Sequence, residues 1–255
     1  MKHIVVNGLS LEYRDIPATV ADQPPLLLLH EGLGCIAFWR DFPTKLAART
    51  GCRVIAWSRA GYGHSQPYPE ARTGRYLHRE AEEALPALLE ALDVDQPVLI
   101  GHSDGGSISL IFAGAFPEAV RAIAVIAPHE FVEAETVAGI LAAKTAWTAT
   151  DWPHRLARYH ADAQRVFSDW SDTWLAPSFA NWSIVDYLGK IRCPVLAIQG
   201  EGDEYASMRQ IDVIAEHAPD TQLLKLAHCG HTPQRDQEAA VLDALVALVN
   251  RVSGS

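Results

Sequence analysis

The sequence has little of what would tie it to a membrane or to nucleic acid. Its purely aliphatic runs are short, such as Leu26 to Leu29 and Ala122 to Ala127, far below the ~20 apolar residues that cross a bilayer. Lysine and arginine number 21 against 31 aspartates and glutamates, a net charge of −10, whereas nucleic acid and anionic membranes attract basic surfaces. We therefore expect neither as a partner. A net negative charge mainly keeps a protein soluble, and it only mildly favours a neutral or cationic small molecule as ligand.

Cysteines are also few, and they are scattered. Cys35, Cys52, Cys193 and Cys229 form no CxxC pair, so their spacing indicates neither a zinc site nor a disulfide framework. The first residues lack the long apolar segment of a signal peptide. We expect free, mostly buried thiols in a reducing cytoplasm and no bound metal. The sequence carries no sign of the oligomeric state.

Length and composition indicate a globular protein with a substantial core. The chain has 255 residues, 49% hydrophobic and 20% charged, which allows one large domain or a domain with an elaboration. KHIVVNG and LEYRDI look like an opening antiparallel pair of strands. The continuous apolar runs that follow are PPLLLLH, CRVIAWS, PVLIGHS, AIAVIAP, PVLAIQG and QLLKLAH. Helical stretches separate these runs, so we predict a mostly parallel α/β sheet that helices cover on both faces.

One interval breaks this alternation. From about Glu130 to Lys190 no strand is apparent, and five of the seven tryptophans fall there: Trp147, Trp152, Trp170, Trp174 and Trp182. We interpret 130–190 as a helical insertion, with 1–129 and 191–255 forming the main domain. The tryptophans suit two roles equally, an aromatic lid over a pocket at the carboxyl ends of the strands or plain packing of the insertion.

The stretch from Gly101 to Gly105, GHSDG, fits the G-x-S-x-G pattern of a nucleophilic serine on a sharp strand-to-helix turn. The apolar run PVLI precedes it and the helical stretch SISLIFAGAF follows it. The free amides at the start of that helix favour the anion that forms during acyl transfer. Ser103 is therefore the predicted nucleophile, and it needs a base and a carboxylate that orients the base.

His231 and Asp203 are the predicted base and acid. His231 lies in CGHTP after the last apolar run, and His228, still within that run, is the weaker alternative. Asp203 follows PVLAIQG. The other acids that could take its place are Glu201, Glu204 and Glu130. The order serine, acid, histidine along the chain is the order of the α/β-hydrolase fold.

Together these motifs resemble the α/β-hydrolase superfamily over nearly the whole chain. The resemblance rests on the order of strands, on GHSDGG, on the acid loop QGEGD, on CGHTP and on the insertion. It implies an eight-stranded sheet with a helical cap between the sixth and seventh strands. It also implies an acyl-enzyme mechanism that needs no metal or organic cofactor. The amides of Gly32 and Asp104 would hold the oxyanion, with Glu31 as the other candidate.

Two motifs depart from the family pattern. Where most members have His-Gly-x, the chain has HEG from His30, and where D-x-R-G-x-G-x-S is common it has WSRAGYGHS. Ser58 and Ala60 stand at the usual aspartate and arginine positions, and Arg59 lies one place early. We hypothesise that Arg59 pairs with Glu31, so that each displaced charge compensates the other.

The stretches GYGHSQP and SDGG are similar to the valacyclovir-hydrolase-like branch, whose members cleave esters of α-amino acids. In that branch the aspartate after the nucleophile binds the substrate's ammonium group, which implies the same role for Asp104. A helix cap is the alternative, and we favour it because aspartate is common in a first helical turn. The predicted substrate-binding residues are Asp104, Glu31, His129, Trp147, Trp170 and Trp174.

The predicted function is hydrolysis of carboxylic esters of small molecules by Ser103, His231 and Asp203. Amino-acid ester hydrolases, lactonases, thioesterases and carbon–carbon bond hydrolases use the same triad, so these activities stay open. A ligand-binding protein of the same fold without catalysis is the alternative from a different class. Such a protein would normally lack one residue of the triad, and none is missing here.

Overall fold

A single sheet of eight strands runs through the centre of the protein. The computed structural model describes residues 1–253. The strands are β1 (Lys2–Val6), β2 (Leu9–Ile16), β3 (Leu26–Leu29), β4 (Val54–Trp57), β5 (Val98–His102), β6 (Ala122–Ile126), β7 (Val195–Gly200) and β8 (Thr221–Leu226). Their spatial order is β1-β2-β4-β3-β5-β6-β7-β8. The strand β2 is antiparallel to β1 and β4, and all other neighbours are parallel. The predicted fold is therefore confirmed.

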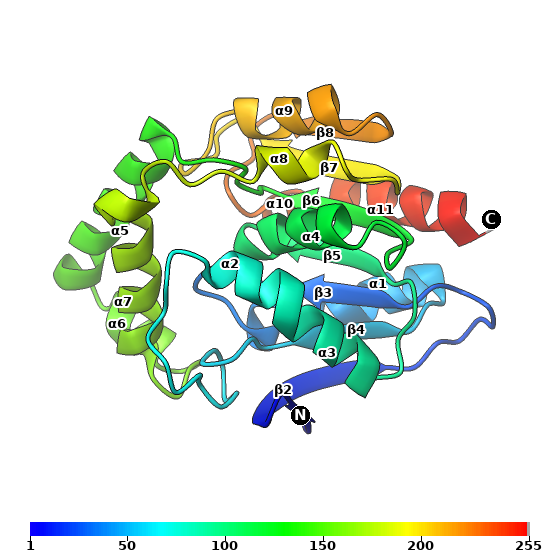
Figure 1. Cartoon of the computed structure of the whole chain (residues 1–255), viewed down its shortest axis with the longest axis horizontal. Coiled ribbons are helices and arrows are strands. Elements are labelled where there is room, and N and C mark those ends of the chain that lie inside the picture. Colours follow the sequence, from blue (N-terminus) through cyan, green and yellow to red (C-terminus); the bar gives the residue numbers. More distant parts are fainter. Residues whose placement is uncertain (254–255) are drawn as a thin grey trace.

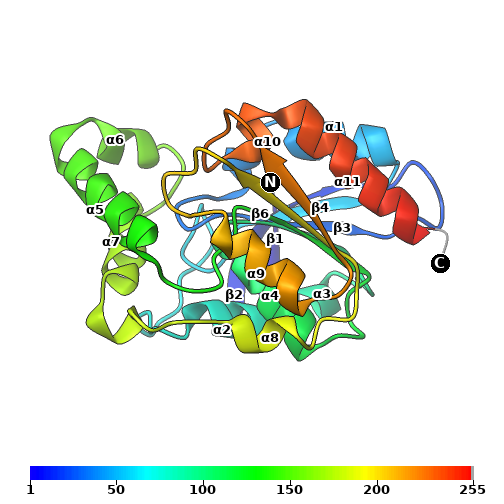
Figure 2. The same cartoon turned by 90° about the horizontal axis from the view of Figure 1, so that it is seen from above.

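Helices cover both faces of this sheet. In the main body they are α1 (Phe42–Thr50), α2 (Tyr76–Arg79), α3 (Leu85–Ala91), α4 (Asp104–Ala115), α8 (Val185–Leu188), α9 (Arg209–His217), α10 (Pro233–Asp236) and α11 (Glu238–Ser253). Figure 2 shows α1 and α11 on one face and α3, α4, α8 and α9 on the other. Alternate residues of a strand point to opposite faces. In β3, Leu27 and Leu29 therefore enter one core, and Leu26 and Leu28 enter the other.

The helical segment before β5 changes its geometry next to a proline. A π-helical turn, η2 (Glu80–Ala84), joins α2 to α3, and Pro86 lies at the start of α3. Proline lacks the backbone N–H and clashes with the carbonyl four residues earlier. The π turn widens the helix just before the proline and so makes room for its ring. The apolar side chains of the segment, among them Leu77, Ala81 and Leu85, stay buried.

Between β6 and β7 the chain forms a helical cap beside the carboxyl ends of the strands (Figure 1). The cap consists of α5 (Ala134–Ala149), α6 (Trp152–Leu156), α7 (Ala163–Trp174) and the 3-10 turn η3 (Pro177–Phe179). At its base Phe131 forms a bridge with Ser183, and the Ile184 N–H donates to the Glu130 carbonyl over 2.8 Å. The helix α8 packs against α4 and α9, so the last residues of the 130–190 interval pack on the main body.

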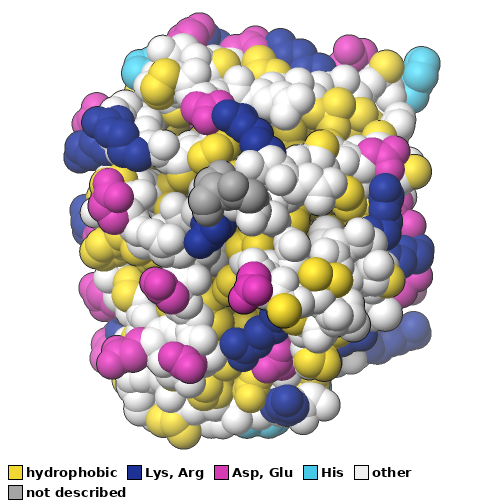
Figure 3. All heavy atoms as spheres, turned by 90° about the vertical axis from the view of Figure 1, so that its right-hand side faces the viewer, with side chains coloured by type: hydrophobic (Ala, Val, Ile, Leu, Met, Phe, Trp, Pro, Cys, Tyr) yellow, Lys and Arg dark blue, Asp and Glu magenta, His cyan; other side chains and the backbone are white. Residues whose placement is uncertain are grey.

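The surface carries charges of both signs. On the face opposite the cap, acidic and basic side chains are interspersed (Figure 3). The four cysteines are free and buried. Within residues 1–253 no helix is both long enough and apolar enough to span a membrane.

Candidate active site

Ser103 lies on a strained turn between β5 and α4. Its φ of 52° and ψ of −117° are rare for a residue with a side chain, and such conformations cost of the order of 1–3 kcal/mol. The turn brings backbone segments so close that only glycine fits beside it. A Cβ atom at Gly101 would collide with the Gly105 carbonyl, and one at Gly105 would collide with the Leu29 carbonyl. The G-x-S-x-G pattern is therefore a steric requirement of this turn.

The three predicted catalytic side chains lie in hydrogen-bonding contact. The Ser103 Oγ is 3.0 Å from Nε2 of His231, and both carboxylate oxygens of Asp203 are 2.9 Å from Nδ1 of His231. Asp203 also accepts hydrogen bonds from the Tyr205 N–H over 2.9 Å and from the Gln199 amide over 2.8 Å. These donors fix the carboxylate, which in turn holds the Nδ1 proton of His231 and leaves Nε2 facing the serine hydroxyl.

The pKa shifts of Asp203 and His231 follow from this contact. Burial alone would raise the pKa of Asp203, but the hydrogen bond and charge of His231 hold it below its ordinary value. Burial alone would lower the pKa of His231, but Asp203 holds it above its ordinary value. Each partner therefore stabilises the charged form of the other, which is the property a histidine base needs when it takes a proton.

The alternative acids are placed differently. The Glu204 carboxylate accepts from the backbone N–H of His231 over 3.2 Å and not from its ring. Glu201 is exposed. Glu130 is fully buried, and within residues 1–253 neither of its carboxylate oxygens has a hydrogen-bond partner. Of these four acids, Asp203 is the one bonded to the ring of His231.

The loop after β3 and the first turn of α4 each bring one backbone amide to the cavity that Ser103 lines. Among residues 1–253, the N–H groups of Gly32 and Asp104 have no protein acceptor. The loop's path is fixed at the Glu31 carbonyl, which accepts from the His30 ring over 2.7 Å, from Arg59 over 3.0 Å and from the Gly34 N–H over 3.1 Å. A side chain at Gly32 would collide with the Trp170 indole, so the cap covers this loop closely.

The hypothesis that Arg59 pairs with the Glu31 carboxylate is wrong. The Arg59 guanidinium lies 3.3 Å from Oδ2 of Asp104, and both side chains are almost completely buried. Arg59 reaches Glu31 only through the backbone carbonyl. The Glu31 carboxylate faces His102 instead, 3.4 Å from its Nδ1. Burial alone would raise the pKa of Glu31, but His102 holds it below its ordinary value.

Asp104 is the centre of a hydrogen-bonded chain that reaches the cap. Its Oδ2 accepts from the Tyr76 hydroxyl over 2.9 Å, and that hydroxyl accepts from the Trp174 indole N–H over 2.9 Å. Asp104 lies in the first turn of α4, but its carboxylate accepts from Arg59 and Tyr76 and from no backbone amide of that turn. It is therefore not the hydrogen-bonding helix cap that we favoured from the sequence. Arg59 supplies a full positive charge at the same oxygen, so the charge of Asp104 is compensated within the protein.

His102, between Gly101 and Ser103, helps to hold the histidine loop. Its Nε2 donates to the His231 carbonyl over 2.7 Å, and its Nδ1 lies 3.0 Å from the Gln234 amide nitrogen. The ring of Tyr205 lies against that of His231, with 4.8 Å between their centres. No signal in the sequence distinguished Tyr76, Tyr205 or Gln234, because these residues reach the site through tertiary packing.

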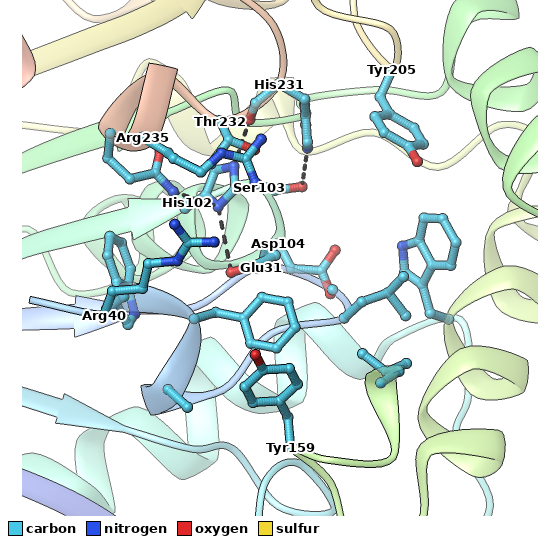
Figure 4. Close-up of a pocket in the computed structure, with 18 of the residues that line it drawn as sticks. Glu31, Arg40, His102, Ser103, Asp104, Tyr159, Tyr205, His231, Thr232 and Arg235 are labelled. Atoms are coloured by element: carbon cyan, nitrogen blue, oxygen red, sulfur yellow. Dashed lines mark hydrogen bonds and ion pairs between the residues drawn. The ribbon is translucent and has the colours of Figure 1, made fainter. Parts of the chain in front are cut away.

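A cavity of about 790 Å³ opens over the serine, a typical size for a small-molecule site. The predicted residues that line it are Glu31, Gly32, Ser103, Asp104, His129, Trp170, Trp174 and His231. Trp152, Tyr159 and Tyr205 line it as well, together with several charged residues near its rim. Figure 4 shows Ser103, His231, Glu31 and Asp104 around this space.

Trp147 is the predicted substrate-binding residue that does not line the cavity. It stacks on Phe167 within the cap, with 4.0 Å between ring centres and 8° between the planes, and its N–H donates to Gln164 over 3.3 Å. Its helical phase turns it toward α7, so it packs the cap together. Trp152 lines the cavity in its place.

The comparison with known sequences identifies the class to which this fold and site belong. The sequence profile of the alpha/beta hydrolase fold matches residues 24–168. The chain therefore belongs to the α/β-hydrolase family.

Individual relatives include hydrolases and peptidases. The chain is 26% identical to the serine hydrolase BPHL of Mus musculus over 227 residues, covering 86% of this chain and 76% of that protein. It is 33% identical to a proline iminopeptidase of Lactobacillus delbrueckii subsp. bulgaricus over 113 residues, covering 44% of this chain and 38% of that protein.

Solved structures share the fold at low identity. An enol-lactonase from Burkholderia xenovorans LB400 has a TM-score of 0.76 at 19% identity, with 98% of this chain and 100% of that chain covered. A bacterial membrane phospholipase A has a TM-score of 0.79 at 20% identity, with 100% of this chain and 86% of that chain covered. These likenesses concern the fold alone.

Proposed function

We propose that this hydrolase cleaves carboxylic esters of small molecules through Ser103, His231 and Asp203. The observation that carries the proposal is the unbroken chain of contacts from the Asp203 carboxylate, 2.9 Å from the His231 ring, to the Ser103 hydroxyl 3.0 Å beyond it. A serine that has both an oriented base and free amides beside it has the parts that acyl transfer needs.

The proposed reaction has two steps. The Ser103 oxygen attacks the ester carbonyl while Nε2 of His231 takes its proton, and the amides of Gly32 and Asp104 hold the resulting oxyanion. His231 then gives that proton to the leaving alcohol, which leaves an acyl group on Ser103. In the second step His231 takes a proton from water, which attacks the acyl group, and then gives this proton to the Ser103 oxygen as the bond to the acyl group breaks and the carboxylic acid leaves. Asp203 stabilises the imidazolium in both steps.

Amide cleavage is the second candidate. One relative is a proline iminopeptidase, and the same triad cleaves amides when the leaving amine is protonated. Recognition of an amino group by Asp104 has less support, because Arg59 and Tyr76 already occupy its Oδ2. We therefore place esters first and test amides beside them.

The test uses a panel of p-nitrophenyl esters of increasing acyl length and the matching p-nitroanilides. Ser103→Ala and His231→Ala should each lower kcat by several powers of ten while the circular dichroism spectrum stays unchanged. His228→Ala, three positions before the base, is the matched control and should retain parental turnover. A fluorophosphonate probe should label Ser103 of the parent.

Two results would contradict the proposal. Ser103→Ala with parental turnover would show that another group performs the reaction. Folded parent protein that neither turns over any ester or amide of the panel nor reacts with the probe would favour a ligand-binding protein of this fold.

A further inference from the structure

The charged residues that line the cavity can be sorted by the partners they have. Lys45 is 2.9 Å from Asp41 and 2.6 Å from Glu238, so its positive charge is more than compensated by two carboxylates. Arg155 is 3.3 Å from Asp151. The positive charges of Lys45 and Arg155 are therefore already compensated by neighbouring carboxylates.

The acids nearest to the serine are also engaged. Asp104 is paired with Arg59, and Glu31 faces His102. Glu204 accepts the backbone N–H of His231. The remaining basic residues of the cavity wall are Arg40 and Arg235.

Arg40 and Arg235 approach the cavity from opposite sides. Arg40 ends the 3-10 turn η1 (Ile36–Trp39) and forms no ion pair with any of residues 1–253. Arg235 lies in α10, directly after the catalytic histidine loop, and its one recorded ion pair is a contact of 3.4 Å with its neighbour Asp236. Figure 4 shows both guanidinium groups turned toward the part of the cavity that holds His102 and Ser103.

The backbone at Arg40 adds an independent observation. Its φ is 51° and its ψ is −121°, a conformation that glycine adopts readily and an arginine rarely does. Strained residues cluster at functional sites, where the side chain has a use that offsets the strain. The chain thus carries an arginine at a position whose backbone favours glycine, on the wall of the substrate cavity.

We propose that Arg40 and Arg235 together bind a carboxylate group of the substrate. The substrates would be esters with a second, anionic end, such as half-esters of dicarboxylic acids or esters of hydroxy acids. The apolar part would lie against the cap residues Trp152, Trp170 and Trp174, which also line the cavity. This inference rests on the proposed ester hydrolysis and names its substrate class.

The chemistry of the two side chains fits this ligand. A guanidinium presents parallel N–H donors that match the two oxygens of a carboxylate, and such charge-assisted hydrogen bonds are among the stronger ones. The chain as a whole carries a charge of −10, which repels an anion at a distance. Arg40, which has no ion pair among the described residues, and Arg235, whose ion pair is a 3.4 Å contact with its neighbour Asp236, supply positive charge at the cavity wall that attracts a carboxylate at short range.

The experiment compares anionic esters with neutral esters of the same shape in a pH-stat. Monoethyl adipate and ethyl hexanoate place the charge on the acyl side, and 4-acetoxybutanoate and butyl acetate place it on the alcohol side. For at least one pair, kcat/KM of the parent should favour the anionic ester by about tenfold or more. Arg40→Gln and Arg235→Gln should each lower that preference by about tenfold.

The control removes the same charge far from the cavity. Arg251, near the end of α11, pairs with Asp220 over 2.7 Å, and Arg251→Gln should change the preference by less than about twofold because salt screens distant charges. Arg40→Gly tests the strain argument. It should lose the preference as Arg40→Gln does, with a thermal midpoint at or above that of Arg40→Gln.

Clear results would overturn the inference. A parent that prefers the neutral ester of both pairs would exclude a carboxylate site, as would equal losses on anionic and neutral esters in both arginine variants. If the parent cleaves no ester at all, the proposed function fails, and calorimetric titration of Ser103→Ala with adipate then decides the present inference. Binding that Arg40→Gln and Arg235→Gln abolish would support the site, and no binding would end it.

Discussion

Replacing Arg59 by methionine tests the energetic role of the buried ion pair beneath the serine. The Arg59 guanidinium and the Asp104 carboxylate are 0% and 1% exposed and lie 3.3 Å apart. Removing one partner of such a pair leaves a buried charge without compensation, at a cost of about 3–5 kcal/mol. Arg59→Met also removes the hydrogen bond to the Glu31 carbonyl. For a domain of this size we expect the thermal midpoint to fall by roughly 10 °C.

The second variant of this test removes the charge that Arg59→Met leaves behind. In Arg59→Met/Asp104→Asn the amide oxygen at position 104 can still accept the Tyr76 hydrogen bond, so about half of the lost stability should return. Urea denaturation followed by tryptophan fluorescence measures each free energy of unfolding. Arg53→Met is the matched control, because the side chains of Arg53 and Asp15 are 30% and 18% exposed and more accessible pairs contribute less.

The reasoning would be refuted by either of two measurements. Arg59→Met that loses less than about 1 kcal/mol would mean that the Asp104 charge is not buried in the way described. If the double variant loses as much stability as Arg59→Met and the single variant Asp104→Asn lose together, the two side chains do not interact.

Three further predictions concern catalysis, pH and the cap. Asp203→Asn should lower kcat by about 10⁴-fold. It should also move the acidic limb of the pH profile of kcat/KM to lower pH, because the carboxylate that raises the pKa of His231 is lost. An acidic limb at the parental pH would contradict this prediction. Burial raises the pKa of Glu130 well above its ordinary value. As the pH rises from the ordinary to the raised pKa, the unfolded chain loses this proton while the folded protein keeps it, so the free energy of unfolding falls. Glu130→Gln should therefore gain stability over the parent as the pH rises from 5 to about 8 in urea titrations, and a constant difference would count against the argument. Tyr76→Phe should cost about 1–3 kcal/mol of folding stability, because it leaves the Trp174 N–H without its acceptor. In a double-mutant cycle, Trp174→Phe should cost less stability in the Tyr76→Phe background than in the parent. Additive losses would show that the two residues are independent.

The strand segments and the turn that carries Ser103 could be predicted from sequence because local patterns and steric rules determine them. Apolar runs without alternation occur where helices cover both faces of a sheet, and β3, β5 and β6 are indeed buried throughout. Gly101 and Gly105 are required by close backbone contacts around Ser103. The positions of His231 and Asp203 followed from the carboxyl ends of neighbouring parallel strands.

Side-chain pairing in the loops could not be predicted in the same way. The spacing of Glu31 and Arg59 allowed an ion pair, but the direction of each side chain depends on the loop's path, which three donors to the Glu31 carbonyl fix. The choice between Trp147 and Trp152 depended on helical phase within the cap, because only the side of a helix that faces the cavity contributes to it.

The contact of Trp174 with Tyr76 has a practical consequence for redesign. Exchanging the cap for that of another hydrolase, in order to change specificity, would also remove the Trp174 donor from the hydrogen-bonded chain that reaches Asp104 through Tyr76. A chimera would therefore gain a new binding surface and lose a hydrogen bond that positions Tyr76 next to Asp104. Grafts that keep positions 170 and 174 offer the better route to new selectivity with turnover retained.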